Sequence, residues 1–192
     1  MQKLIVASKN SGKINEFKRI LQIASLDIEL VTDLEIPDVT ETGKTFEENS
    51  LLKARTICKL TGLPAIADDS GICVDALGGA PGLYSARYSG QGDTANNEKL
   101  LAEMANVPDE SRGAYFICVA AYVRPDGFEK VEEGRFYGKI LHQSKGSGGF
   151  GYDPLFQPEG LNCSSAELSA EEKDAISHRG KAMRAIAPYI IG

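Results

Sequence analysis

The pattern of apolar and polar residues near the N-terminus predicts a strand, a polar loop and a helix in that order. The apolar run at 3–7 is typical of a short strand, and the polar residues after it have the composition of a turn. Ile14, Phe17 and Leu21 then recur at helical spacing with charged residues between them. A second apolar run, at 28–31, predicts another strand.

A capping pattern predicts where the second helix begins. Thr45 is followed three residues later by Glu48, and these two side chains can satisfy the free amides at a helix start. We expect this helix to reach about position 60, with Leu51, Ala54 and Cys58 facing the core.

Two short apolar runs flank a pair of adjacent carboxylates. Residues 64–67 predict a brief strand that ends at Asp68 and Asp69, and residues 72–74 resume an extended apolar stretch. The two acids are therefore expected at the end of a strand. The segment 77–92, which is rich in glycine, tyrosine and serine, predicts an extended loop.

The second half of the chain alternates helical and strand-like patterns. The expected elements are a helix at 97–104, strands at 114–123 and 130–140, and a helical region from a second capping pattern at 169–172, interrupted at 178–180. Pro125 and Gly127 between the two strands are typical of a turn, so an antiparallel hairpin is expected there. Intermixed helices and strands with a hairpin imply an α/β fold with a mixed sheet. No repeat or linker divides the chain, and we expect one domain over residues 1–192.

The composition is that of an ordinary globular protein with an acidic balance. Of the 192 residues, 42% are hydrophobic, which suffices for a sizeable core. The 27 acidic residues outnumber the 21 basic ones, so no polynucleotide partner is expected. No apolar run approaches the roughly 18 residues of a membrane span, and none at the start suits a secretory signal, so we expect a cytoplasmic protein with no membrane partner. The four cysteines stand singly, which disfavours zinc and redox motifs.

A polar loop between the first strand and the first helix is a candidate phosphate site. It consists of Ser8, Lys9, Asn10, Ser11, Gly12 and Lys13. Free amides at a helix start, together with a lysine, can hold a phosphate. The loop does not match G-x-x-x-x-G-K-[ST], because Ala7 stands five residues before Gly12 and Ile14 follows Lys13. A solvated helix start is the alternative interpretation.

A glycine-rich segment at 146–151 formally matches G-x-G-x-x-G. A dinucleotide site does not follow, because Tyr152, Asp153 and Pro154 stand where a helix would have to begin. The segment can instead be a loop that lets its backbone approach a ligand and presents Phe150, Tyr152 and Asp153. The alternative is a tight turn with a core aromatic residue.

Carboxylates form a candidate metal site. Asp68 and Asp69 precede Ser70 and Gly71 at an expected strand end, where ligand sites of α/β sheets gather. Carboxylate oxygens suit Mg²⁺, which proteins hold through one or two carboxylates plus substrate phosphates. A solvated acidic turn is the alternative. Further acids stand upstream at Glu35, Asp38, Glu41, Glu47 and Glu48, of which the last two are expected to serve the helix cap.

Basic residues outside the first loop add candidate anion contacts. Lys53 lies four residues after Asn49, so both share a helix face, and Lys173 with the pair His178 and Arg179 brings donors near the C-terminus. Singly, such residues are usually solvated. Together with the phosphate loop, the carboxylate pair and the glycine loop, they describe a nucleotide site.

Six motifs occur in an order that resembles a known enzyme family. They are Ser8-Lys9-Asn10-Ser11-Gly12-Lys13, Thr45-Phe46-Glu47-Glu48-Asn49, Ala67-Asp68-Asp69-Ser70-Gly71, Gly78-Gly79-Ala80-Pro81-Gly82 with Tyr84-Ser85-Ala86-Arg87, Phe150-Gly151-Tyr152-Asp153-Pro154 and Ser177-His178-Arg179. Over essentially its whole length the chain resembles the Ham1/RdgB family of inosine/xanthosine triphosphate pyrophosphatases. The resemblance implies an elongated mixed sheet flanked by helices, two lobes with a central active-site cleft, and a homodimer. It also implies Mg²⁺-dependent hydrolysis of ITP, dITP, XTP and dXTP to the monophosphate and pyrophosphate.

The resemblance also implies roles for particular residues. Asp69 matches the proton acceptor and a magnesium ligand, and Glu41 is the best match for a second metal carboxylate, with Asp38 nearby as the alternative. The residues that match substrate contacts are Ser8, Lys9, Asn10, Ser11, Gly12 and Lys13 at the triphosphate, Ser70 beside Asp69, Phe150, Gly151, Tyr152 and Asp153 at the purine, Lys173, and the pair His178 and Arg179 at the base.

These roles imply a mechanism in which water attacks the α-phosphorus. Asp69 would take the water proton and Mg²⁺ would neutralise the departing pyrophosphate, with Lys13, Lys53 and the loop amides stabilising the same charge. One alternative is a nucleotide-binding sensor without turnover, which the intact Asp69 argues against. Another is a phosphatase of broader range, which a product assay distinguishes.

Overall fold

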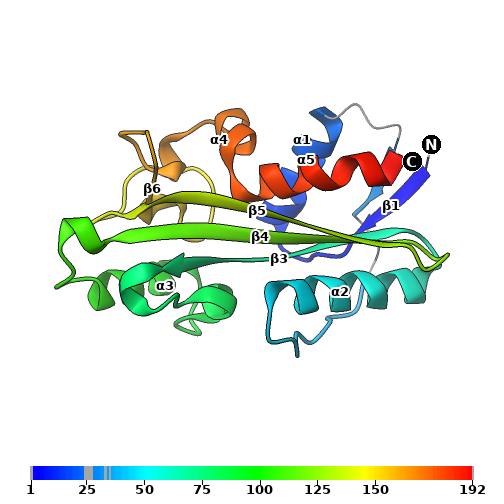
Figure 1. Ribbon diagram of the computed structural model, residues 1–192, viewed down its shortest axis with the longest axis horizontal. Coiled ribbons are helices and arrows are strands. Elements are labelled where there is room, and N and C mark those ends of the chain that lie inside the picture. The colour runs from blue at the N-terminus through cyan, green and yellow to red at the C-terminus, as the bar shows by residue number, and fades with distance from the viewer. Residues whose placement is uncertain (1, 24–27, 33, 35, 192) are drawn as a thin grey trace. The chain divides into compact units, whose positions relative to one another are not determined.

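The protein, represented by a computed structural model that describes residues 2–23, 28–32, 34 and 36–191, forms a mixed six-stranded sheet with helices (Figure 1). The sheet has the order β2-β1-β3-β4-β5-β6, with β1 parallel to β2 and β3, and β5 antiparallel to β6. The strands are β1 (Gln2–Val6), β2 (Ile28–Val31), β3 (Ala65–Val74), β4 (Gly113–Val123), β5 (Glu129–Ile140) and β6 (Phe156–Pro158). The helices are α1 (Ser11–Ile23), α2 (Phe46–Thr61), α3 (Asp93–Glu103), α4 (Ala170–Ile176) and α5 (His178–Ile191). The predicted α/β class with a mixed sheet is confirmed.

The chain divides into two compact units, each built from separate stretches of sequence. Unit 1 comprises Met1–Asp69, Cys118–Gly134 and His178–Gly192, and unit 2 comprises Ser70–Ile117 and Arg135–Ser177. The strands β3, β4 and β5 contribute residues to both units. None of the helices in the described ranges is long and apolar enough to cross a membrane.

Unit 1 has helices on both faces of its sheet (Figure 1). The alternation of side chains along each strand separates two apolar cores. One core joins α1 and α5 to the sheet through Leu4, Val6, Phe17, Ile20, Leu21, Ile66, Cys118, Ala120, Tyr122, Ala182, Met183, Ile186, Ala187 and Ile190. The other joins α2 to the opposite face through Ile5, Ala7, Ala54, Ile57, Cys58, Ala65, Ala67, Ala121 and Val123. Alternate residues of these strands therefore face different helix layers.

Unit 2 packs α3 and an aromatic cluster against its part of the sheet. Its core contains Ile72, Val74, Leu100, Met104, Ala114, Phe116, Phe136, Ile140, Tyr152, Leu155 and Phe156. The rings of Phe116 and Phe136 lie 4.8 and 5.2 Å from that of Phe156 between ring centres. These contacts fix the strand β6 and the preceding segment, which carries Tyr152 and Asp153.

The helix starts agree with the capping patterns, with one difference. The Thr45 hydroxyl accepts a hydrogen bond from the Glu48 amide at 3.1 Å, but the Glu48 carboxylate accepts from the Lys44 amide at 2.5 Å. In the full capping pattern the Glu48 carboxylate would accept from the Thr45 amide, but here it accepts from the amide one residue earlier. The start of α2 is therefore also bonded to the loop that precedes it. At the second site the full reciprocal pattern forms between Ser169 and Glu172.

Three expectations about element boundaries were wrong. The strand β3 does not end at the acidic pair but runs continuously through it from Ala65 to Val74. The expected loop at 77–92 contains a 3₁₀ helix at Gly82–Arg87. The helical break lies at Ser177, whose extended backbone separates α4 from α5, so the residues 178–180 form the first turn of α5. A Cβ on Gly134 of β5 would collide with the backbone of that turn, so the glycine allows α5 to pack directly on the strand.

Candidate active site

The two adjacent carboxylates lie within β3 and point to opposite faces of the sheet in unit 1. β1 pairs with β3 at Ala65 and Ile66 and ends at Val6, so the acids lie just beyond the end of the neighbouring strand. Because side chains alternate, Asp68 follows Ile66 on the face covered by α1 and α5, whereas Asp69 follows Ala67 on the face covered by α2. The two acids consequently meet different sets of partners.

Asp68 is the centre of a buried ion cluster. Its Oδ2 accepts a hydrogen bond from Arg179 Nη2 at 2.9 Å and lies 3.1 Å from Lys13 Nζ. The same guanidinium also pairs with Glu16 on α1. Burial alone would raise the pKa of Asp68, but the charges of Arg179 and Lys13 hold it well below its ordinary range. Asp68 is therefore ionised at neutral pH, and it ties the start of α5 to the start of α1.

Asp69 faces a polar group on α2. It is 6% exposed, and its Oδ2 accepts a hydrogen bond from Asn49 Nδ2 at 3.0 Å. The Lys53 ammonium lies 3.8 Å from Asp69 Oδ1 and 2.6 Å from Glu41 Oε1. Burial raises the pKa of Asp69 above its ordinary value, and Lys53 offsets only part of that shift. A carboxylate in such an environment is suited to accept a proton.

Lys53 is held between carboxylates. Burial alone would lower its pKa, but the charges of Asp68, Asp69 and Glu41 raise it above the ordinary value. Lys53 therefore remains protonated, and it can bind a phosphate if its carboxylate partners are satisfied by another cation.

The loop at 8–13 leads directly into α1. Asn10 caps the helix, because its side-chain oxygen accepts from the Lys13 amide at 3.0 Å, while the Asn10 amide donates to the Ser8 hydroxyl at 3.3 Å. Lys9 and Asn10 are exposed, whereas Lys13 is largely covered and points to Asp68. The structure thus places Lys13 beside the carboxylate pair and leaves the tip of the loop open to solvent.

The predicted purine-binding segment lies in unit 2 and is tightly held. Asp153 is buried, and its Oδ2 accepts from Lys173 Nζ at 2.5 Å and from the Phe150 amide at 2.9 Å. The Lys173 ammonium also lies 5.0 Å from the centre of the Phe150 ring. Three of the predicted substrate residues are therefore joined in one local group.

Two residues of α3 that were not selected from the sequence hold the same segment. The Gly151 amide donates to Asp93 Oδ2 at 2.9 Å, and the Gly151 carbonyl accepts from Asn97 Nδ2 at 2.9 Å. The Tyr152 hydroxyl donates to the Ser85 carbonyl at 2.7 Å. The spacing of four residues between Asp93 and Asn97 was a usable signal, because it places both on one helix face.

The C-terminal pair lies in the first turn of α5, in unit 1. His178 and Arg179 are both buried, and Arg179 is 1% exposed. Its guanidinium is engaged with Asp68 and Glu16, so contact with a base would require these ion pairs to open. Ser70, the next residue after Asp69 in β3, is partly exposed.

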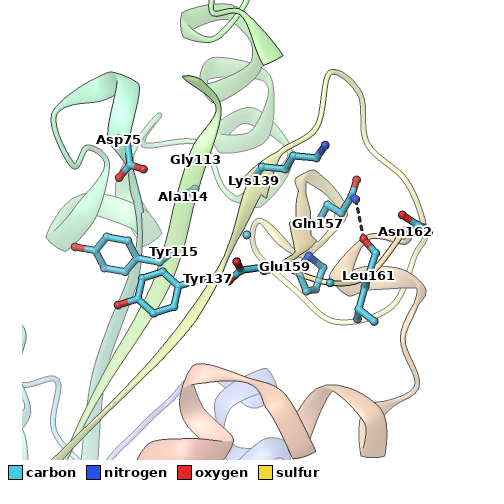
Figure 2. A pocket seen from close by; sticks show the side chains of 13 residues that line it. Asp75, Gly113, Ala114, Tyr115, Tyr137, Lys139, Gln157, Glu159, Leu161 and Asn162 are labelled. Carbon is cyan, nitrogen blue, oxygen red and sulfur yellow. Dashed lines mark hydrogen bonds between the residues drawn. The ribbon is translucent and has the colours of Figure 1, made fainter. Parts of the chain in front are cut away.

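A pocket of about 690 Å³ lies in unit 2 (Figure 2). Its lining includes Tyr115 and Tyr137, whose ring centres are 5.6 Å apart, and Lys139 on the same strand as Tyr137. None of the residues that line it is a predicted catalytic, substrate-binding or metal-binding residue.

The donor set for a metal consists of two carboxylates rather than a complete cage. Within the described residues, no group of three or more His, Cys, Asp and Glu side chains is arranged to hold a metal ion. Glu41 and Asp69 nevertheless converge on one cationic atom, Lys53 Nζ. Two converging carboxylates fit Mg²⁺, which commonly keeps its remaining positions for water and substrate phosphate. Asp38 instead lies near Lys9, at 3.9 Å, and Glu35 lies outside the described residues.

The Ham1 family matches residues 4–189. The chain belongs to the Ham1 family. Two solved structures have the same fold: a HAM1 protein from Coxiella burnetii, with 39% identity and a TM-score of 0.88 over 99% of this chain and 98% of that one, and a nucleoside-triphosphatase / dITP/XTP pyrophosphatase from Mycobacterium abscessus, with 48% identity and a TM-score of 0.77 over 98% and 100%.

The chain is also similar, over nearly its full length, to proteins that have a functional name. A dITP/XTP pyrophosphatase from Streptomyces coelicolor is 55% identical over 195 aligned residues, which cover 99% of this chain and 98% of that protein. The aligned region therefore spans the acidic pair, the loop at 8–13 and the first turn of α5. The expected membership of this family is confirmed.

Proposed function

We propose that this protein hydrolyses non-canonical purine nucleoside triphosphates (ITP, dITP, XTP and dXTP) to the monophosphate and pyrophosphate. The observation that carries the proposal is the buried carboxylate Asp69, which has a raised pKa and lies beside the ammonium of Lys53. Such a pair supplies a proton acceptor and a cation for phosphate in one place. Full-length similarity to a protein named dITP/XTP pyrophosphatase supports the choice of substrate class.

A small group of residues in unit 1 would carry out the proposed reaction. Asp69 would take a proton from the water that attacks the α-phosphorus. Lys13, Lys53 and the amides of the loop at 8–13 would bind the triphosphate and stabilise the negative charge that develops on the departing pyrophosphate. Asp68 would hold Lys13 at the site before substrate binds, through the ion pair between them.

Glu41 and Asp69 would hold a magnesium ion. When bound, Mg²⁺ supplies positive charge to the phosphate oxygens. Glu41 and Asp69 already converge on one cationic group, the Lys53 ammonium, so their oxygens lie where a second cation could be bound. With Glu41 and Asp69 satisfied in this way, Lys53 would be released to bind phosphate.

Base recognition is assigned to residues that the family resemblance selects. Phe150 and Tyr152 would contact the purine, with Asp153 and Lys173 fixing the segment, and His178 would donate to the 6-keto oxygen of hypoxanthine or xanthine. Adenine carries an amino donor at that position, so a buried donor would be left facing another donor. Guanine keeps the 6-keto group, so its rejection depends on the 2-amino side.

The proposed assembly follows from the same resemblance, and the proposed location from the expectation stated in the sequence analysis. We propose a homodimer that works in the cytoplasm, where nucleoside triphosphates are made and used. We propose no polynucleotide partner, because the chain carries a net negative charge. Sedimentation of the full chain, with and without nucleotide, measures the oligomeric state directly.

The proposed function is tested by a panel of nucleoside triphosphates with Mg²⁺. We expect ITP and XTP to be cleaved fastest, GTP well behind, and ATP and the pyrimidine nucleotides slowest. The product should be pyrophosphate from a single cleavage, because attack is at the α-phosphorus. Stepwise release of orthophosphate would instead indicate a broad phosphatase, and tight binding of ITP without any product would indicate a nucleotide sensor.

Replacing Lys13 tests the phosphate role of the first loop. Lys13→Ala should raise KM and lower kcat by a similar factor for every triphosphate, because phosphate contacts carry no information about the base. The measurement is kcat/KM for ITP, XTP and GTP, with Lys18→Ala, further along α1, as the matched control. A large change in the ratio of ITP to GTP would show that Lys13 reads the base.

A further inference from the structure

Asn49 connects the two carboxylates of the proposed metal site. It is 2% exposed on the first turns of α2. Its Nδ2 donates to Asp69 Oδ2 at 3.0 Å, and its Oδ1 accepts from the Gly43 amide at 2.8 Å. One planar amide therefore joins the strand that carries Asp69 to the loop that carries Glu41, two residues before Gly43.

The loop is packed closely on the Asn49 side chain. A Cβ on Gly43 would lie 2.6 Å from Asn49 Oδ1 and 2.7 Å from the Cβ of Glu48, which is shorter than real contacts allow. The next residue of the loop is held as well, because the Lys44 amide donates to Glu48 Oε2 at 2.5 Å. The loop is thus attached to the first turn of α2 at two successive amides.

The amide of Asn49 also orients the Asp69 carboxylate. By donating to Oδ2 it leaves Oδ1 on the side of Lys53, where Glu41 Oε1 is already in contact with the same ammonium. Asn49 and Lys53 are four residues apart on one face of α2, so the helix presents both groups to the carboxylate pair. The Asn49 contact therefore helps to fix the rotation of the Asp69 carboxylate relative to Glu41.

We propose that Asn49 is a positioning residue that sets the separation and orientation of Asp69 and Glu41, and thereby the affinity of the protein for a divalent cation. The inference rests on the proposed assignment of a metal to these two carboxylates, but not on turnover or on the choice of nucleotide. Hydrogen-bond partners of metal ligands typically contribute 10–100-fold in metal affinity. The alternative is that Asn49 only ties α2 to β3, in which case its loss would lower stability without a specific effect on metal binding.

The decisive measurement is a titration of the full chain with Mn²⁺ alone. The concentration of free Mn²⁺ is measured by electron paramagnetic resonance. Mn²⁺ suits the same carboxylate ligands as Mg²⁺. Asn49→Ala should weaken Mn²⁺ binding by at least about tenfold. Ser50→Ala is the matched control, because Ser50 is the next residue of α2, is also buried, and donates its hydroxyl to the Glu47 carbonyl within the same helix. It should bind Mn²⁺ as the unchanged protein does.

A double-mutant cycle separates positioning from general destabilisation. If Asn49 acts through the spacing of the two carboxylates, Asn49→Ala should weaken Mn²⁺ binding much less in a Glu41→Ala background, because the pair no longer exists. A purely structural loss would be additive with Glu41→Ala. The loop can also be disturbed from the other side: Gly43→Ala keeps the Asn49 and Asp69 side chains but places a methyl group 2.6 Å from Asn49 Oδ1, and it should weaken Mn²⁺ binding severalfold. This second variant keeps the test informative if Asn49→Ala does not fold.

The outcomes are distinct for the inference and for the proposed function. Tenfold weaker Mn²⁺ binding in Asn49→Ala, with Ser50→Ala unchanged and a non-additive cycle with Glu41→Ala, supports the inference. An unchanged dissociation constant in folded Asn49→Ala and Gly43→Ala, or no Mn²⁺ binding by the unchanged protein, overturns it. Failure of the protein to release pyrophosphate from ITP would reject the proposed function while leaving the Mn²⁺ result to stand on its own.

Discussion

Asp69→Asn is expected to reduce pyrophosphate release from ITP by about 10²–10⁴-fold while the protein stays folded. The substitution is nearly isosteric, but an amide cannot take a proton from water and is a weaker ligand for a cation than a carboxylate. The environment of Asp69 fits this role, since burial raises its pKa and Asn49 and Lys53 hold its two oxygens. The measurement is kcat at saturating ITP and Mg²⁺.

The neighbouring acid provides the control for this experiment. Asp68→Asn removes one negative charge at the adjacent position, but Asp68 bonds to Arg179 and Lys13 rather than facing α2. Its main effect should therefore appear in the free energy of unfolding, and its effect on turnover should be limited to the part that Asp68 plays in holding Lys13. Near-normal turnover by a folded Asp69→Asn protein saturated with Mg²⁺ would remove Asp69 from the mechanism.

Arg179→Ala is expected to lower the free energy of unfolding by about 3–5 kcal/mol, because it leaves Asp68 and Glu16 buried without their shared cation. The guanidinium is 1% exposed, so water cannot replace it without opening the first turn of α5. Urea unfolding at neutral pH measures the effect. Arg184→Ala on the exposed side of α5 is the control, and exposed ion pairs are worth at most about 1 kcal/mol.

The same variant tests the role in base recognition that the resemblance suggests. If Arg179 supports Asp68 and Glu16, any active Arg179→Ala protein should keep most of its preference for ITP over ATP. If the guanidinium leaves these partners to bind the base, the ratio of kcat/KM for ITP to that for ATP should fall, chiefly through slower cleavage of ITP. A loss of stability below about 1 kcal/mol, the range of an exposed ion pair, would contradict the structural role.

Local sequence pattern was a good guide to most helices and strands, and a poor guide to the strand that carries the chemistry. β1, β2, β4 and β5 were expected close to their observed bounds, and the turn residues Pro125 and Gly127 marked where β4 ends and β5 begins. The pattern breaks at Asp68, Asp69 and Ser70, so a strand end was expected there. Ion pairs and hydrogen bonds inside unit 1 let these acids be buried within β3.

The partners that make this possible are far away along the chain. Arg179 lies 111 residues from Asp68, and no local window contains both. The acidic pair and the basic pair were each selected from the sequence, but their direct contact was not. Asn49 was placed on the face of Lys53 by its spacing, whereas its second bond, to the Gly43 backbone, depends on a loop whose course has no periodic signal.

Because Asp68 and Asp69 point to opposite faces of the sheet, the site depends on the exact register of β3. A one-residue deletion upstream of the pair would move Asp69 to the place that faces Arg179 and bring Ser70 to the place that faces Asn49, which preserves the ion cluster and removes the proton acceptor. A one-residue insertion would do the reverse: Asp68 would face Asn49, and Ala67 would leave Arg179 without its carboxylate. The two adjacent aspartates therefore cannot replace one another. The deletion would remove the proton acceptor, and the insertion would remove the carboxylate that pairs with Arg179.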